Sequence, residues 1–168
     1  NYLNDADWTM TTAAEYTVLS ESARLEFYHF LESEIGHDGG QVLISVDGGD
    51  WILVEPEGGY PDQTVEAFRN EPGYSGRIVN WSLARFDLSA YQGSVIRIRF
   101  RFGSDESLNN YDGWHIDDMT FWGCEIPIYA SVSGVINDQN DQPAVDINVS
   151  DGRQVVLTDD EGGYLLRN

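Results

Sequence analysis

The chain lacks lysine altogether, and this absence sets the first limit on its partners. All nine basic residues are arginine, against 29 acidic residues, which gives a net charge of −20 over 168 residues. A chain this acidic is repelled by phosphate backbones and anionic headgroups, so nucleic acid and anionic membranes are excluded as partners. The charge favours a protein that works in salt or binds divalent cations, because either would screen the self-repulsion.

Cysteine and long hydrophobic runs are almost as scarce. Cys124 stands alone and cannot form an internal disulfide. No stretch approaches eighteen apolar residues, so we expect no membrane insertion. The chain starts at Asn1 with neither an initiator methionine nor a signal peptide, which suggests a mature or excised piece of a longer protein.

Catalytic signatures are absent too. The three histidines do not form a His-Glu-x-x-His zinc motif, and there is no Gly-x-Ser-x-Gly elbow and no phosphate-binding glycine loop. Pairs of carboxylates suited to glycosidase chemistry arise by chance among 29 acids. We therefore expect a protein that is not an enzyme.

Short strands with alternating apolar residues make up most of the chain. Residues 95–102 alternate between an apolar face and a face with Arg97, Arg99 and Arg101. Residues 41–46 end at an Asp-Gly turn typical of hairpins. Without a convincing amphipathic helix, this pattern predicts an all-β fold, an antiparallel jelly-roll sandwich. The arginines either pair with neighbouring carboxylates or form a site for an anionic ligand.

A second β pattern begins after a change in composition near residue 124. We expect a jelly-roll module over residues 1–123, a linker over 124–129 and part of a second β-sandwich over 130–168. The second pattern has three short strands and then stops. It is therefore either docked on the first domain or the first half of a domain cut short.

Residues 110–122 carry three carboxylates within a β-like stretch. If residues 114–122 form one strand, alternation places Asp118 on the same face as Trp114 and Ile116. A carboxylate on an inward face is costly unless a cation or several hydrogen-bond donors meet it. This predicts a structural metal site or a buried polar network, not a catalytic centre.

Aromatic residues on loops and strands are candidates for ligand binding. The loop of residues 55–80 is long and rich in proline and glycine, and such loops often carry binding residues. Its tyrosines either stack on a ligand or pack the loop onto the core. The candidate ligand-binding residues are Trp51, Tyr60, Tyr74, Trp81 and Tyr111.

Several segments carry a family resemblance in combination. They are Leu25-Glu26-Phe27-Tyr28-His29-Phe30, Glu34-x-x-x-Asp38-Gly39-Gly40, Ser45-x-Asp47-Gly48-Gly49-x-Trp51, Phe86-Asp87-Leu88-Ser89-Ala90-Tyr91-Gln92-Gly93, Ile98-Arg99-Phe100-Arg101-Phe102-Gly103-Ser104-Asp105 and Gly113-Trp114-His115-Ile116-Asp117-Asp118. Together they span residues 25–122 and resemble the MAM-like β-jelly-roll modules of the immune-inhibitor-A type. Those modules follow the catalytic domain of secreted bacterial metallopeptidases.

The end of the chain resembles the opening half of a carboxypeptidase-regulatory-like (prealbumin-like) domain. The residues that carry this resemblance are Ser133-Gly134-Val135-Ile136, Gln142-Pro143-Ala144, Val145-x-Ile147-x-Val149 and Thr158-Asp159-x-x-Gly162-x-Tyr164. Both resemblances imply a fragment of a longer secreted or cell-surface bacterial protein.

Five acids in or near glycine-containing turns are the candidate calcium ligands. Calcium takes six to eight hard oxygen ligands in flexible geometry, which suits such turns. The alternative is that these acids cap turns and pair with arginine. The candidates are Glu34, Asp38, Asp112, Asp117 and Asp118.

We therefore expect a non-catalytic, calcium-stabilised accessory or adhesion module that recognises protein or glycan at the cell surface and contacts neighbouring domains of its parent chain. Two alternatives stay open. One is a carbohydrate-binding module, and the other is a structural subunit of an extracellular assembly that is completed by strand addition.

Overall fold

The computed structural model describes residues 1–126, 132–150 and 155–166, and these residues form an all-β protein with antiparallel sheets. The fold class expected from the sequence, an antiparallel sandwich, is therefore confirmed. The chain divides into two compact units, Asn1–Ile126 and Pro127–Asn168, and each is described by itself. Among the described residues, no helix has the length and apolar character needed to cross a membrane.

The first unit has eleven strands and two single-turn 3₁₀ helices. The strands are β1 (Asp7–Thr11), β2 (Tyr16–Val18), β3 (Arg24–Glu32), β4 (Gly39–Val46), β5 (Ile52–Leu53), β6 (Asp62–Val65), β7 (Glu71–Ser75), β8 (Arg77–Asp87), β9 (Val95–Gly103), β10 (Gly113–Trp122) and β11 (Cys124–Glu125). The helices are η1 (Glu66–Phe68) and η2 (Ser89–Tyr91).

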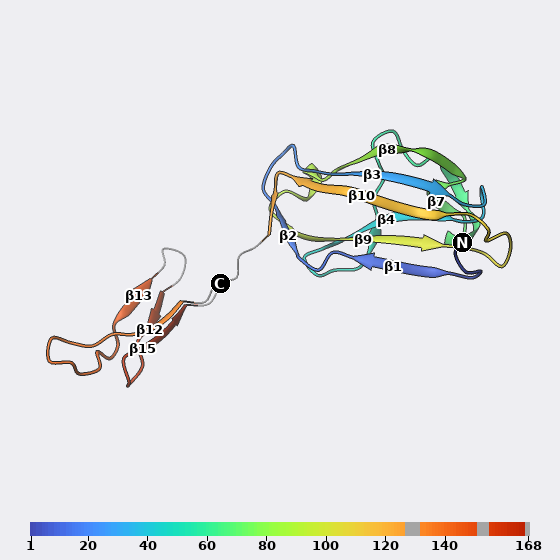
Figure 1. The fold of residues 1–168 in the computed structure, drawn as a ribbon. Coiled ribbons are helices and arrows are strands. Elements are labelled where there is room, and N and C mark those ends of the chain that lie inside the picture. The colour runs from blue at the N-terminus through green and yellow to red at the C-terminus, as the bar shows by residue number, and fades with distance from the viewer. Residues whose placement is uncertain (127–131, 151–154, 167–168) are drawn as a thin grey trace. The chain divides into compact units, whose positions relative to one another are not determined.

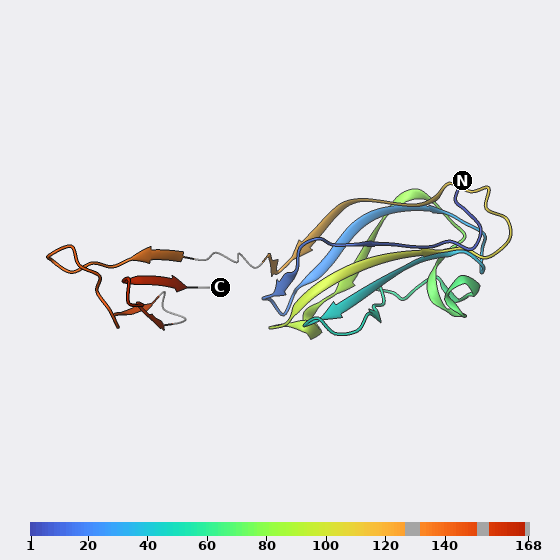
Figure 2. The same cartoon turned by 90° about the horizontal axis from the view of Figure 1, so that it is seen from below.

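These strands form two sheets that pack face to face (Figures 1 and 2). The large sheet has the order β11-β2-β9-β4-β7-β6, with β1 also paired to β9 and β5 paired to β4. The small sheet has the order β10-β3-β8. Consequently β1 and β10 are both edge strands.

The core lies between the two sheets and is rich in aromatic rings. Phe27 of β3 is fully buried and contacts Phe86 and Phe100, with ring centroids 5.7 and 5.2 Å apart. Trp114 of β10 packs against the backbone of Gly40, where an added Cβ would clash with the indole ring. Burying each large apolar side chain contributes about 1.5–3 kcal/mol, so these rings fix how the sheets stack.

A β-bulge in β10 overturns the prediction that Asp118 faces inward. The register of β10 with β3 shifts between Asp117 and Thr120, and Asp118 takes a positive φ of 51°. The bulge changes the alternation, so Trp114 lies toward the core while Trp122 and Asp118 are exposed. No cation is needed to compensate Asp118, because its carboxylate is in solvent.

The second unit contains two strand pairs in its described residues. They are β12 (Val132–Val135) with β15 (Gly163–Leu166), and β13 (Asn148–Ser150) with β14 (Val155–Leu157). Thr158 joins the segments: its buried hydroxyl donates to the Ala144 carbonyl at 2.6 Å and accepts from the Ile147 amide at 2.9 Å.

The boundary between the units differs slightly from the expected linker. Cys124 and Glu125 form β11, which pairs with β2 and so belongs to the first unit. Residues 127–129 of the expected linker lie outside the described residues.

His29 is a core histidine with a defined partner. Its ring is buried, and its Nδ1 atom accepts a hydrogen bond from the Trp114 indole at 3.1 Å. Burial lowers the pKa of His29 to about 4. The neutral ring thus links β3 to β10 inside the core.

We expect this burial to make the fold sensitive to mild acid. Unfolded histidine titrates near pH 6.5, so the unfolded chain binds the proton first as pH falls. Stability contributed by neutral His29 is full above about pH 6.5 and is lost as pH falls toward 4. We expect the free energy of unfolding to fall by about 2 kcal/mol between pH 6.5 and 5. Urea unfolding at several pH values measures this loss. In the His29→Gln variant the glutamine does not titrate, so this part of the dependence of unfolding free energy on pH disappears. An equal dependence on pH in both proteins would contradict the assignment.

Candidate metal centre

Strand register brings distant acids together at one end of the sandwich. Gly39 at the start of β4 pairs with Gly103 at the end of β9. Asp38, one residue before β4, therefore meets the segment that follows β9. The amide of Asp105 in that segment donates to Asp38 Oδ1 at 2.9 Å.

Three carboxylates share this end of the sheet. Ligand oxygens of Glu34, Asp38 and Asp105 all lie within 4.8 Å of one another. Asp38 is fully buried, and its Oδ2 accepts a 2.6 Å hydrogen bond from the Tyr2 hydroxyl. Ser107 Oγ donates to Glu34 at 3.1 Å. These contacts fix the carboxylates close together despite their like charge.

The pKa values of two of these acids move in opposite directions. Burial raises the pKa of Asp38, and the charges of Asp105 and Glu34 add to that rise, although hydrogen bonds from Tyr2 and Asp105 oppose it. Burial alone would raise the pKa of Asp105 too, but hydrogen bonds from Ser107 and His37 outweigh it and lower the pKa. An ionised Asp38 is therefore costly at neutral pH, and a nearby cation would offset that cost.

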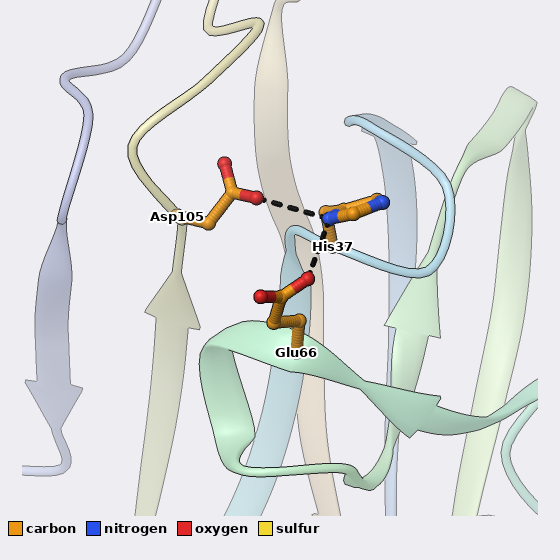
Figure 3. Close-up of side chains that lie close together, drawn as sticks. All are labelled: His37, Glu66 and Asp105. Atoms are coloured by element: carbon orange, nitrogen blue, oxygen red, sulfur yellow. Dashed lines mark hydrogen bonds and ion pairs between the residues drawn. The ribbon is translucent and has the colours of Figure 1, made fainter.

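His37 forms a second group with Asp105. Figure 3 shows its ring between two carboxylates, with Nδ1 at 3.0 Å from Asp105 Oδ2 and 2.8 Å from Glu66 Oε2. Burial would lower the pKa of His37, but the Asp105 hydrogen bond and the charges of Glu34, Asp105 and Glu66 raise it. A protonated His37 can thus neutralise part of the acidic cluster from its outer side.

The donor set of the three carboxylates fits a hard divalent cation. Glu34, Asp38 and Asp105 each bring one carboxylate oxygen to the site, and calcium binds hard oxygen ligands in flexible geometry. Backbone carbonyls or water would have to complete its six to eight ligands. The group with His37 contains a nitrogen donor, which suits transition metals better than calcium. The first group is therefore the better candidate for calcium.

The structure brings together only part of the predicted ligand set. Glu34 and Asp38 lie side by side as expected, whereas Asp112, Asp117 and Asp118 belong to neither acidic group among the described residues. Asp117 lies four residues from Gly113 along β10, which is about 13 Å in an extended strand. The Asp118 amide donates to the Asp117 carboxylate at 2.8 Å.

Asp105 was missing from the predicted set, although a signal for it exists in the sequence. It follows the strongest strand, residues 95–102, and lies within the segment that carries the family resemblance. Antiparallel pairing of that strand with residues 41–46 would have placed Asp105 beside Asp38.

The five candidate ligand-binding aromatics differ in their burial and contacts. Tyr60 and Tyr74 are buried, so neither presents an exposed ring, and their role in ligand binding stays a prediction. The Tyr60 hydroxyl donates to the Val54 carbonyl at 2.9 Å and accepts from the Val42 amide. Trp51 has one face covered by the Arg99 guanidinium, 3.9 Å from its ring. Tyr111 packs partly against the core, and Trp81 is exposed.

The arginine stripe of β9 ties the edge of the large sheet to its centre. Arg101 pairs with Asp7 of β1 at 2.7 Å, as expected for a structural ion pair. Arg99 and Arg97 instead donate to the hydroxyl of Thr11 and the carbonyl of Thr12. The stripe therefore holds β1 and the segment after it against β9.

Comparison with known proteins finds similarity to a part of a much longer chain. Bacillopeptidase F of Bacillus subtilis (strain 168) is 30% identical to this chain over 121 residues. The match covers 71% of this chain but only 7% of that protein, which is a peptidase by name. No family model matches the chain, so the resemblance to MAM-like modules stays a prediction.

We expect the Tyr2 hydroxyl to stabilise the buried carboxylate of Asp38. Tyr2→Phe removes a 2.6 Å hydrogen bond and leaves that carboxylate short of a donor. The free energy of unfolding should fall by about 1–3 kcal/mol in urea titrations with EDTA present. Tyr28→Phe is the matched control because Tyr28 is exposed on the small sheet. Equal effects of the two changes would show that the hydrogen bond is unimportant.

Proposed function

We propose that the first unit is a non-catalytic, calcium-stabilised accessory module of a secreted or cell-surface multidomain protein. The observation that carries the proposal is the convergence of Glu34, Asp38 and Asp105 within 4.8 Å, with Asp38 fully buried, in a chain of net charge −20. A bound calcium ion would remove the repulsion among these carboxylates and would join the loop before β4 to the segment after β9.

The accessory role is supported by the match to a small part of a long peptidase. Its immediate partners would be the neighbouring domains of the parent chain. Its outward task would be to recognise protein or glycan at the cell surface and so to position the parent protein. The candidate centre uses its carboxylates to hold an ion and to fix loops, not to transfer protons.

Calcium should raise the melting temperature of the protein after EDTA treatment. Binding to the native state alone stabilises it by about 2.7 kcal/mol at a hundred times the dissociation constant, which corresponds to a rise of about 5 °C or more in a unit of this size. Asp105→Asn should lose most of the rise. The measurement is circular dichroism melting at several calcium concentrations, with magnesium in parallel.

Asp118→Asn is the matched control for that experiment, because Asp118 is an exposed aspartate outside the cluster. It should keep the full calcium-dependent rise. The calcium proposal fails if the wild-type protein shows no rise, or if Asp105→Asn responds to calcium as the wild type does.

A further inference from the structure

A groove of about 460 Å³ opens on the first unit where the two edge strands β1 and β10 approach each other. It shares no lining residue with the acidic cluster. Its volume falls in the range of about 300–1,000 Å³ typical of small-ligand sites. The lining residues are Trp8, Thr9, Met10, Trp81, Phe100, Phe102, Trp114, His115 and Ile116.

The groove exists because the large sheet extends beyond the small one. Trp8 pairs with Phe102 and Met10 pairs with Phe100, so both residues of β1 belong to the same face of the sheet as these core phenylalanines. The small sheet ends at β10, and Trp8 and Met10 consequently stay 49% and 55% exposed. An exposed apolar surface that runs into the core is a feature of binding sites.

The two exposed tryptophans of the groove, Trp8 and Trp81, each pack against a phenylalanine. The Trp8 ring lies 6.4 Å from that of Phe102, and the Trp81 ring lies 6.5 Å from that of Phe30. Trp81 is 52% exposed, so each indole is supported by a phenylalanine and leaves about half of its surface to solvent. Rings held in this way bind a ligand without a large loss of side-chain entropy.

The lining is uncharged in a strongly acidic protein. None of the nine lining residues is Asp, Glu or Arg, although the chain has 29 acids and nine arginines. One polar group is oriented: His115 Nε2 lies 3.1 Å from the Asp112 carbonyl, which can only accept, so Nε2 carries the hydrogen. In the neutral ring Nδ1 is then an acceptor for a ligand hydroxyl.

We propose that this groove binds an uncharged oligosaccharide whose ring hydroxyls are equatorial, such as a β-1,4-linked glucose or N-acetylglucosamine chain. In such sugars the axial C–H groups form an apolar face that can lie on an indole, while the hydroxyls at the rim accept and donate hydrogen bonds. The groove supplies both features through Trp8, Trp81 and His115. The absence of lining charge excludes a requirement for uronate or sulfate groups. The inference rests on the recognition role proposed above and names its ligand class.

The test is isothermal titration calorimetry of the intact chain with cellohexaose and with chitohexaose, and with polygalacturonate as the acidic comparison. We expect saturable binding of at least one neutral oligosaccharide and none of polygalacturonate. Trp8→Ala and Trp81→Ala should each weaken binding by about tenfold or more. Trp122→Ala is the matched control, because Trp122 is 47% exposed but lies outside the groove, and its affinity should be unchanged.

A second measurement uses the wild-type protein, so that it does not depend on whether the variants fold. Bound oligosaccharide should shield part of the tryptophan fluorescence from acrylamide quenching. The proposal is overturned if neither neutral oligosaccharide saturates, if polygalacturonate binds as well as they do, or if Trp122→Ala weakens binding as much as Trp81→Ala. A failure here leaves the calcium-dependent rise in melting temperature intact, whereas failure of the calcium site alone would abolish that rise and leave sugar binding in place.

Discussion

The pairing of β4 with β9 is the constraint on which the candidate site depends. Because Gly39 lies opposite Gly103, the residue before one strand meets the segment after the other, and Asp38 is buried against the amide of Asp105. Burial makes the charge of Asp38 expensive, and the like charges of Glu34 and Asp105 add to the cost. Tyr2 and His37 offset part of it from two sides. A cation held by the three carboxylates would complete this compensation and fix three separate segments of the chain.

The two proposed sites differ in chemistry and lie next to each other, because Tyr2 bonds Asp38 through its hydroxyl and packs its ring 4.8 Å from that of Phe102 in the groove. Charged oxygen atoms gather at the end of the sheets around Asp38, where they would bind an ion and stabilise the fold. Apolar rings lie where β1 and β10 leave the core uncovered, in a groove whose lining contains no Asp, Glu or Arg. The arginines of β9 contribute to the groove indirectly, because they hold β1 in place through Asp7, Thr11 and Thr12. A rigid scaffold with a stabilising ion and a separate recognition groove suits a module that positions a larger protein.

Much of the fold could be predicted from alternation alone, since β4 and β9 have regular two-residue periods and a clear Asp-Gly turn. Alternation failed at β10, where a bulge at Asp118 moved that carboxylate into solvent. No pattern of residue types marks such a bulge. Glu34 and Asp38 could be found because they share one loop, but Asp105 is 67 residues from Asp38 and required the strand register. Burial of Tyr60 and Tyr74 could not be read from a loop with little periodicity, because it depends on tertiary packing.

The central claim is that the acidic cluster around the buried Asp38 holds calcium. The most direct measurement is a crystal structure of the chain grown with calcium chloride, with anomalous data to identify the ion. The account predicts an ion at the end of β4 and β9, with oxygens of Glu34, Asp38 and Asp105 at about 2.3–2.6 Å. It would be contradicted by a structure in which these carboxylates contact only water, Tyr2 and His37 while calcium lies elsewhere or is absent.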